Sequence, residues 1–462
     1  MLIRNGEATS EEVVCEFIGR IQEVNSYVNG LVDERFEIAV EEARKVDKLI
    51  QSGELDEIEL KDKFPLLGVP FTIKDSFCVA GLRHTAGSYY RKDIIAAEDA
   101  EVVKSLKSVG AIPIGVTNES LRYRHITVQG AAGSAFGIGS DIAGSIRVPS
   151  LFCGIFGHKP TSGIISCWAT RSEGIEELLT TGPMARHAND LRLIFDVLIG
   201  ESVHKMNKIP EKAQLRILFM EDDGGSPLAS PVDPEMKDAL RKAVQHLEQT
   251  YGVKAQVSPC NRLRRGVNLL LVVIFHSNCP RTLLMKANFS KLYHSLEIWV
   301  QAVSGAGGVP FCEELSLQKG KINPFWELVK FCFRISPHTL PAIMLGIIEK
   351  IAYVGNQLPR HKRIIEMGYS LAKEIQDVLK TTQYFVSHPA PRHYVPLFRP
   401  ADFSYCAVFN VLVPVTQVPL GLGSKGLPLG VQVVGGMHSD HITISVAEEL
   451  ERAFGGWVQP SI

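Results

Sequence analysis

The sequence lacks the features that mark membrane-spanning, nucleic-acid-binding, zinc-binding or disulfide-bonded proteins. No run of apolar residues reaches the roughly 18 that a spanning helix needs, and residues 1–7 hold Arg4 and Glu7 in place of the apolar core of a signal peptide. The 49 Lys and Arg residues balance 50 Asp and Glu residues, so the net charge of −1 gives no electrostatic reason to expect a nucleic-acid partner. The nine cysteines are single, with no C-x-x-C pair. Their spacing argues against a zinc site and a disulfide framework, and for a reducing, intracellular compartment.

What is present in the first third is an alternation of helix-like and strand-like segments. Residues 9–12, Thr-Ser-Glu-Glu, match a capping box, in which the first side chain and the last satisfy free amides at a helix start. Apolar residues then follow at helical spacing. Further patterns predict a helix at 34–50 ended by Gly53, a strand at 66–73, a helix at 100–109 and a strand at 112–116. This alternation favours an α/β sheet that is buried on both faces.

The remainder of the chain is predicted to be helical in its middle and to return to strands at its end. Residues 203–383 look mostly helical, with a strand at 215–220 and a helix at 235–251, and the apolar run 267–275 is typical of a buried strand or helix segment. The last part predicts strands at 411–418 and 429–434 and a helix at 442–454. Since there is no internal repeat, low-complexity tract or linker, we expect one large α/β domain over residues 1–462.

The segment richest in chemistry is the glycine-rich stretch from Gly139 to Ser150. Its small residues let the backbone approach a ligand closely. Four consecutive amides, those of Ile142, Ala143, Gly144 and Ser145, could bind a developing oxyanion, and Ser145 is well placed as a nucleophile. The alternative is a tight turn with a buried serine.

The neighbours of this stretch narrow its interpretation. Asp141 and Arg147 flank it and are expected to pair and hold the loop. Gly137-Ile138-Gly139 begins like a dinucleotide fingerprint, but Ile142 stands where the third glycine is needed, so that interpretation is rejected.

Lys74, which ends the apolar run Gly68 to Asp75, is the candidate base. Burial disfavours the charged ammonium form, which suits a general base. The alternative is a surface lysine at a strand end, paired with Asp75. His158, in Phe-Gly-His-Lys-Pro, is expected to be structural instead of catalytic.

Together these segments resemble the amidase-signature family, over nearly the whole chain. Within it they are similar to the type-two branch of the fatty-acid amide hydrolases, on Glu221 to Ser226, Ser387-His388-Pro389, Val395-Pro396-Leu397 and Phe454 to Val458. The family-wide matches are Gly68 to Asp75, Gly139 to Pro149, Gly154 to Gly163, Thr181 to Arg186 and Gly426 to Gly436.

The resemblance implies a mixed β-sheet covered by helices and a Ser–cis-Ser–Lys triad. Ser145 would be the acyl-forming nucleophile, Lys74 the neutral base, and the amides of residues 142–145 the oxyanion hole. The implied substrate is a small-molecule fatty-acid amide, with no metal or organic cofactor.

The sequence departs from the family where the relay serine belongs. The family carries Gly-Gly-Ser-Ser-Gly-Gly upstream of the nucleophile, and its first serine passes the proton between lysine and nucleophile. Here about 30 residues, enough for a loop and a helix, are missing near 121–132, and the register places Leu121 at the serine. The nearby hydroxyls of Ser120, Thr127 and Ser134 lack the flanking glycines.

The departure leaves the origin and activity of the chain open. A splice form, a faulty gene model and a non-catalytic relative all fit the sequence. The type-two branch also usually starts with a hydrophobic membrane anchor, and this sequence begins after it, which suggests a longer natural form. Two functions from different classes therefore stand: a fatty-acid amide hydrolase, and a catalytically silent protein that binds acyl amides.

A last feature concerns peripheral contact with a membrane. Residues 323–334 place aromatic side chains beside Lys330 and Arg334, a composition that can lie in a bilayer interface. A helix packed into the core is the alternative. The oligomeric state is not indicated by the sequence.

Overall fold

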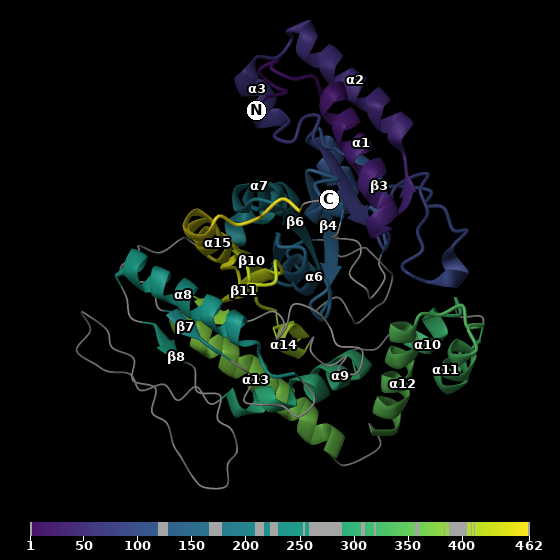
Figure 1. Cartoon of the computed structure of the whole chain (residues 1–462), viewed down its shortest axis with the longest axis vertical. Coiled ribbons are helices and arrows are strands. Elements are labelled where there is room, and N and C mark those ends of the chain that lie inside the picture. Colours follow the sequence, from purple (N-terminus) through teal and green to yellow (C-terminus); the bar gives the residue numbers. More distant parts are fainter. Residues whose placement is uncertain are drawn as a thin grey trace.

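The centre of the molecule is one mixed β-sheet that draws strands from both ends of the chain (Figure 1). This computed structural model describes residues 2–118, 128–165, 178–207, 217–221, 230–252, 255–257, 289–305, 310–317, 320–355, 360–382, 384–387, 404–407, 409–410 and 412–460. Within them, eleven strands follow the order β1-β3-β2-β4-β6-β5-β10-β11-β9-β7-β8. The strands are β1 Leu31–Glu34, β2 Pro70–Lys74, β3 Ile112–Thr117, β4 Phe136–Asp141, β5 Phe156–Lys159, β6 Thr180–Ala185, β7 Ile217–Phe219, β8 Gln256–Val257, β9 Tyr384–Ser387, β10 Val415–Leu422 and β11 Pro428–Gly435.

The pairing of the strands brings two chain segments to a common edge. Strand β2 runs parallel to both β3 and β4, whereas β4 pairs antiparallel with β6 and β10 antiparallel with β11. Because parallel neighbours end at the same edge of a sheet, the carboxyl ends of β2 and β4 lie together, and ligands of such sheets bind outside these ends. The predicted mixed sheet covered by helices is confirmed.

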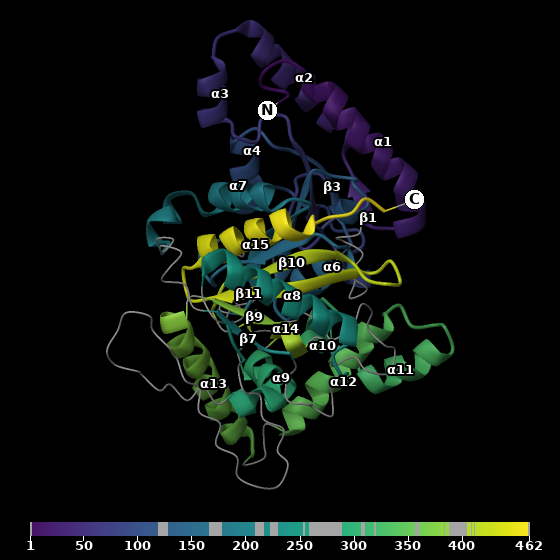
Figure 2. The same cartoon turned by 60° about the vertical axis from the view of Figure 1, so that its left-hand side comes forward.

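Helices cover both faces of the sheet (Figure 2). On one face, helix α7 packs on β5 and β6, and helix α15 packs on β10 and β11. Helix α8 packs on β7, β9 and β11. Helix α6 packs on β5, β10 and β11. The helices are α1 Ser10–Val28, α2 Phe36–Ser52, α3 Glu57–Lys63, α4 Glu101–Ser108, α6 Arg147–Phe152, α7 Ala188–Ile199, α8 Pro234–Tyr251, α9 Ser295–Gly305, α10 Phe311–Glu314, α11 Pro324–Cys332, α12 Leu340–Gly355, α13 Arg360–Thr382, α14 Ser404–Ala407 and α15 Asp440–Phe454. Short 3₁₀ turns occupy Tyr89–Arg91, Gly200–Lys205 and Phe289–His294.

Alternation along the strands separates an apolar face from one that carries polar groups. In β11, Val431 and Val433 join the large apolar core under α8 and α15, whereas Val434 joins a separate core under α13. Gln432 is fully buried and hydrogen-bonds to Ser387 and to the carbonyl of Tyr405 in α14. Successive side chains of a strand point to opposite faces, so this strand presents an amide toward α14 and valines toward α15.

Local sequence signals are confirmed where they act within one element. Thr9 and Glu12 form the predicted capping box at the start of α1, and Gly53 caps α2 in a left-handed conformation. The predicted strand at 66–73 begins too early, because residues 65–68 form a turn before β2. The predicted helix at 34–50 is displaced, because residues 31–34 pair with β3 as strand β1.

Near the end of the chain β10 runs over 415–422, later than predicted. The apolar run 267–275 lies outside the described residues. Among the residues that the structure does describe, no helix is long and apolar enough to cross a bilayer.

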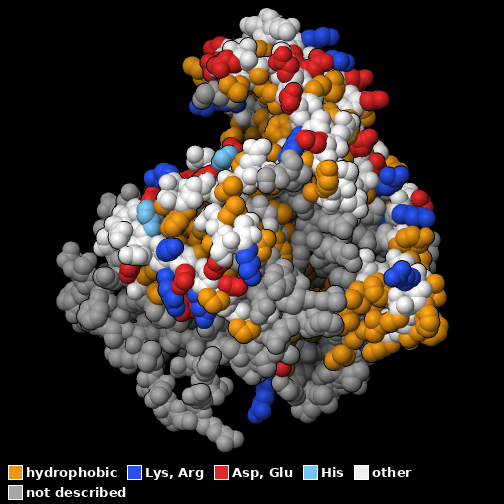
Figure 3. Space-filling view, viewed as in Figure 1, with side chains coloured by type: hydrophobic (Ala, Val, Ile, Leu, Met, Phe, Trp, Pro, Cys, Tyr) orange, Lys and Arg blue, Asp and Glu red, His pale blue; other side chains and the backbone are white. Residues whose placement is uncertain are grey.

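Helix α11 and its C-cap residue Phe333 leave three aromatic side chains exposed. Phe325, Trp326 and Phe333 are 53%, 58% and 72% exposed, and the buried members of the helix are Pro324 and Glu327. The alternative of a core-packed helix is therefore wrong for these rings. Figure 3 shows hydrophobic side chains gathered at the corner of the molecule where α10, α11 and α12 lie.

Candidate active site

The candidate base lies at the sheet edge where β2 and β4 end together. Lys74 is the last residue of β2 and only 4% exposed, so the alternative of a surface lysine is wrong. Its Nζ donates a hydrogen bond to Oγ of Ser140 at 3.0 Å, and this serine is buried near the end of β4. The two residues meet because β2 and β4 are parallel neighbours, with Ile73 opposite Ile138.

The candidate nucleophile sits on the loop that joins β4 to α6. Ser145 is half-buried there, and Gly144 precedes it with a φ of +111°. A Cβ on Gly144 would lie 2.5 Å from Cβ of Cys406 in α14. Both the backbone conformation and the close approach thus require glycine at this position.

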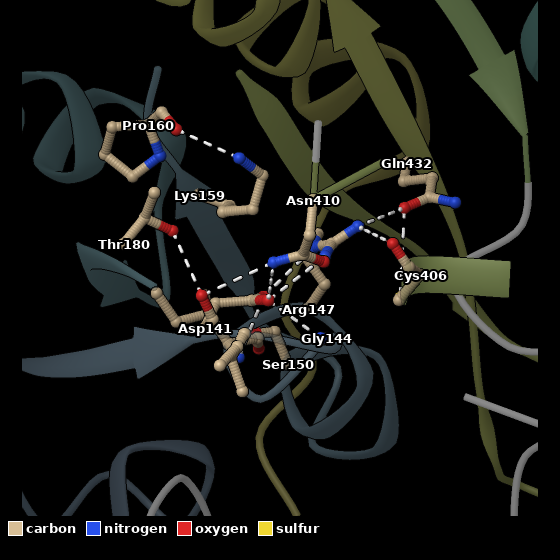
Figure 4. A network of polar contacts seen from close by, with 12 residues as sticks. Asp141, Gly144, Arg147, Ser150, Lys159, Pro160, Thr180, Cys406, Asn410 and Gln432 are labelled. Atoms are coloured by element: carbon tan, nitrogen blue, oxygen red, sulfur yellow. Dashed lines mark hydrogen bonds and ion pairs between the residues drawn. The ribbon is translucent and has the colours of Figure 1, made fainter. Parts of the chain in front are cut away.

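A buried ion pair fixes the base of this loop (Figure 4). Nε and Nη2 of Arg147 donate to the two oxygens of Asp141 at 3.0 and 3.1 Å, and both side chains are fully buried. The predicted pairing of these residues is confirmed. Burial alone would raise the pKa of the Asp141 carboxyl, but the adjacent Arg147 guanidinium holds that pKa well below its ordinary value.

Arg147 also ties this loop to the C-terminal third of the chain. Its guanidinium donates to the Cys406 carbonyl at 2.9 Å, to Oδ1 of Asn410 at 2.7 Å and to Oε1 of Gln432 at 3.2 Å. Asn410 in turn donates to Oδ1 of Asp141 at 3.1 Å. Sequence reasoning missed Asn410 and Gln432, because neither lies in a motif and their separation from Arg147 exceeds 260 residues.

One of the four predicted oxyanion donors is engaged within the loop. The Gly144 amide donates to Oδ1 of Asp141 at 2.7 Å, and the Ile146 amide donates to Oδ2 at 3.2 Å. The Asp141 carboxylate thus holds the turn by accepting hydrogen bonds from two of its backbone amides. The Gly144 amide is therefore occupied by Asp141 in this conformation.

The other polar residues singled out in the sequence have structural surroundings. Nδ1 of His158 lies 2.9 Å from the Thr416 hydroxyl and Nε2 lies 3.1 Å from Oδ1 of Asp440, with both ionisable side chains fully buried. Asp440 also accepts from the amide and the hydroxyl of Thr161. This network joins β5, β10 and α15. Burial lowers the pKa of His158 against the opposing effect of Asp440.

Of the three hydroxyl residues near the missing segment, the structure describes only Ser134. Ser134 is fully buried, donates to the Phe136 carbonyl at 3.1 Å and lies 3.1 Å from the Thr72 hydroxyl. Ser120, Thr127 and the register position Leu121 lie outside the described residues. The structure places the Ser140 hydroxyl beside Lys74, and sequence reasoning missed this serine although it adjoins Asp141 in the glycine-rich stretch.

Comparison with known proteins identifies the class. A model of the family described as Amidase matches residues 12–121 and 128–305, and the chain belongs to this family. The match is interrupted between residues 121 and 128, where the sequence departs from the family pattern.

The relatives and solved structures agree with this assignment. Fatty-acid amide hydrolase 2 of Homo sapiens is 38% identical, covering 99% of this chain and 88% of the relative, and Fatty-acid amide hydrolase 2-B of Danio rerio is also 38% identical, over 100% and 89%. The human alignment extends over 505 positions, more than the 462 residues of this chain, so it places gaps in this chain.

The fold is shared with a bacterial aryl acylamidase of the amidase-signature family at a TM-score of 0.72, with 17% identity, covering 98% of this chain and 94% of the other. It is also shared with a fatty acid amide hydrolase at 0.69, with 16% identity, covering 99% and 84%.

Proposed function

We propose that this chain hydrolyses the carbon–nitrogen bond of fatty-acid amides through an acyl-enzyme on Ser145. The observation that carries the proposal is the buried Lys74 at the sheet edge where the loop of Ser145 begins. Relatives that are 38% identical along nearly the whole chain and are named fatty-acid amide hydrolases support the reaction and the substrate class.

The chemistry follows from the residue types. Oγ of Ser145 attacks the amide carbonyl while its proton passes toward the amine of Lys74, and the carbonyl oxygen becomes an oxyanion held by loop amides. The carbon–nitrogen bond then breaks, the nitrogen leaves as the protonated amine, and an ester joins the acyl group to Ser145. Water hydrolyses that ester, which releases the fatty acid and restores the hydroxyl.

The test of the nucleophile is covalent labelling. A fluorophosphonate probe forms a bond to an activated serine, so we expect it to label the purified chain and to leave Ser145→Ala unlabelled. Ser108→Ala, an exposed position at the end of α4, is the matched control and should label like the wild type. Equal labelling of Ser145→Ala and the wild type would refute the assignment.

A second candidate function is binding of acyl amides without turnover. The missing relay element favours it, because proton transfer needs heavy atoms within about 3.2 Å or one bridging water. A positioned acid–base group is typically worth about 10² to 10⁴ in rate. We therefore expect a chain with the Gly-Gly-Ser-Ser-Gly-Gly element and its helix restored to hydrolyse oleamide faster by that order.

The comparison needs both proteins shown to be folded by circular dichroism. Binding of oleamide with no turnover by the chain as it stands would favour the silent binder. Equal turnover by both chains would show that the element is dispensable and would remove the reason for this second candidate.

We also propose that the exposed rings of α11 rest on a lipid surface. Phe325, Trp326 and Phe333 lie on the same short segment as Lys330 and Arg334, so the rings can enter the interface while the cations face anionic headgroups. Tyr90, half-exposed on another segment, lies with its ring 5.8 Å from that of His338 and extends the apolar surface.

Flotation with liposomes of phosphatidylcholine and phosphatidylserine tests this contact. The double variant Phe325→Glu, Trp326→Glu should float less than the wild type. The matched control replaces two even more exposed rings elsewhere, Tyr27→Glu on α1 and Tyr369→Glu on α13, and should float normally. Unchanged flotation of the folded α11 variant would contradict the proposal.

A further inference from the structure

The loop that carries Ser145 is held by an indole from a distant helix. Nε1 of Trp299, in α9, donates a hydrogen bond to the carbonyl oxygen of Ile142 at 2.8 Å, across 157 residues of sequence. Trp299 is half-buried, and α9 packs against α14, whose Cys406 contacts Gly144 in the same loop. Two neighbouring helices thus contact the backbone of the loop at adjacent peptides.

The hydrogen bond to Ile142 fixes the direction of the next amide. The Ile142 carbonyl and the Ala143 amide belong to one peptide plane, which is trans, so the C=O and the N–H point in opposite directions. A donor on one side of the plane therefore sets where the N–H on the other side points. If the peptide rotates, the carbonyl replaces the amide, and an acceptor faces whatever the amide faced before.

The Ala143 amide is the more important as an oxyanion donor because the Gly144 amide of the same loop already donates to Asp141. The Gly144 amide donates to Asp141, which also accepts from the Ile146 amide. Among the described residues, the Ala143 amide has no such acceptor. Loss of one preorganised donor to an oxyanion typically costs about 10² to 10³ in kcat, so the orientation of this single peptide is a sensitive point.

We propose that Trp299 is a positioning residue, which keeps the Ala143 amide directed at the oxyanion that forms during hydrolysis. This inference rests on the proposed function, because it assumes that an acyl group is attacked by Ser145. The indole contributes no group to the reaction itself. It acts through the Ile142 carbonyl, and an aromatic ring without an N–H at position 299 would keep the packing of α9 but lose the control of the peptide.

The test compares Trp299→Phe, which removes the N–H, with Trp299→His, which keeps a ring N–H. The substrate is a short-chain p-nitrophenyl ester, so that membrane binding plays no part, and the rate of fluorophosphonate labelling is measured alongside. We expect Trp299→Phe to lower kcat about 10- to 100-fold with little change in KM, and to slow labelling by a similar factor. Trp299→His should recover part of the loss.

The matched control is Trp457→Phe. Nε1 of Trp457 also donates to a backbone carbonyl at 3.1 Å, but this carbonyl belongs to Gly130, outside the loop of Ser145. This variant should keep the wild-type kcat. A merely structural role for Trp299 would lower the unfolding midpoint of Trp299→Phe while leaving kcat per folded molecule unchanged.

The outcomes separate the two proposals. A wild-type chain labelled at Ser145, with Trp299→Phe equal to it in kcat and labelling rate, would overturn the positioning role alone. A folded wild-type chain that the probe does not label at Ser145 would overturn the proposed function and this inference with it. A loss shared equally by Trp299→Phe and Trp457→Phe would also overturn the inference, because it would show a general effect of removing the N–H of a half-buried indole.

Discussion

Removing the guanidinium of Arg147 should destabilise this protein more than an ordinary core substitution. In Arg147→Met, the Asp141 carboxylate would stay fully buried without its cation. Three further acceptors would each lose one hydrogen bond: the Cys406 carbonyl, Oδ1 of Asn410 and Oε1 of Gln432. Breaking a buried ion pair from one side typically costs about 3–5 kcal/mol, and the lost hydrogen bonds to these acceptors place the expected cost at the upper end of that range. We therefore expect a loss of roughly 5 kcal/mol in the free energy of unfolding.

A double-mutant cycle keeps the prediction testable if the single variant folds poorly. Asp141→Asn retains an oxygen for the Gly144 amide but removes the charge. The double variant Asp141→Asn, Arg147→Met removes both charges of the pair, so it should be destabilised by less than the sum of the two single changes. Urea unfolding at pH 7, followed by tryptophan fluorescence and circular dichroism, measures all four proteins. A cost below about 1 kcal/mol for Arg147→Met, or strict additivity, would refute the reasoning.

The pair of Asp141 and Arg147 also predicts that the free energy of unfolding falls at acidic pH, which gives the stability profile an acid limb. Because the pKa of folded Asp141 lies below its ordinary value of 3.8, the unfolded chain binds a proton more readily than the folded one as the pH falls. The contribution of the pair is therefore full above that ordinary value and is lost progressively below it. Wild type and Asp141→Asn should differ in this acid limb, and identical profiles would contradict the assignment.

Three further predictions concern the loop, the base and the buried histidine. Gly144→Ala should slow fluorophosphonate labelling at least about tenfold, because its Cβ would overlap Cys406; Gly163→Ala, also at positive φ but facing open space, should label normally. Ser140→Ala should lower kcat about tenfold or more by removing a hydrogen bond that positions Nζ of Lys74, and Ser140→Thr should retain most of the activity. Burial lowers the pKa of His158 below its ordinary value of 6.5. The neutral, buried histidine therefore contributes fully to stability above pH 6.5, and this contribution is lost as the pH falls. Thermal unfolding between pH 7 and 5 should show a steeper loss of stability for the wild type than for His158→Gln.

The sequence by itself determined the features that depend on neighbours a few residues apart. The capping box of Thr9 and Glu12, the end of α2 at Gly53 and the helix that ends at Tyr251 all follow from hydrogen bonds or apolar spacing within one turn or one helix face. The pairing of Asp141 with Arg147 is of the same kind, since six residues separate them on one loop. Such interactions form wherever the local chain can adopt the conformation, so the local sequence suffices to predict them.

The tertiary structure decided which groups meet across the sheet and between distant helices. Lys74 meets Ser140 only because β2 and β4 are parallel neighbours in a definite register. Arg147 reaches Gln432 because α6 packs on β11, and Trp299 reaches Ile142 because α9 lies beside the loop. No spacing in the sequence encodes these contacts, because they depend on strand order and helix packing, which the whole chain sets through burial of its apolar faces. The boundary errors at β1 and β2 have the same cause, since strand ends are fixed by the partner strand and not by the segment's own residues.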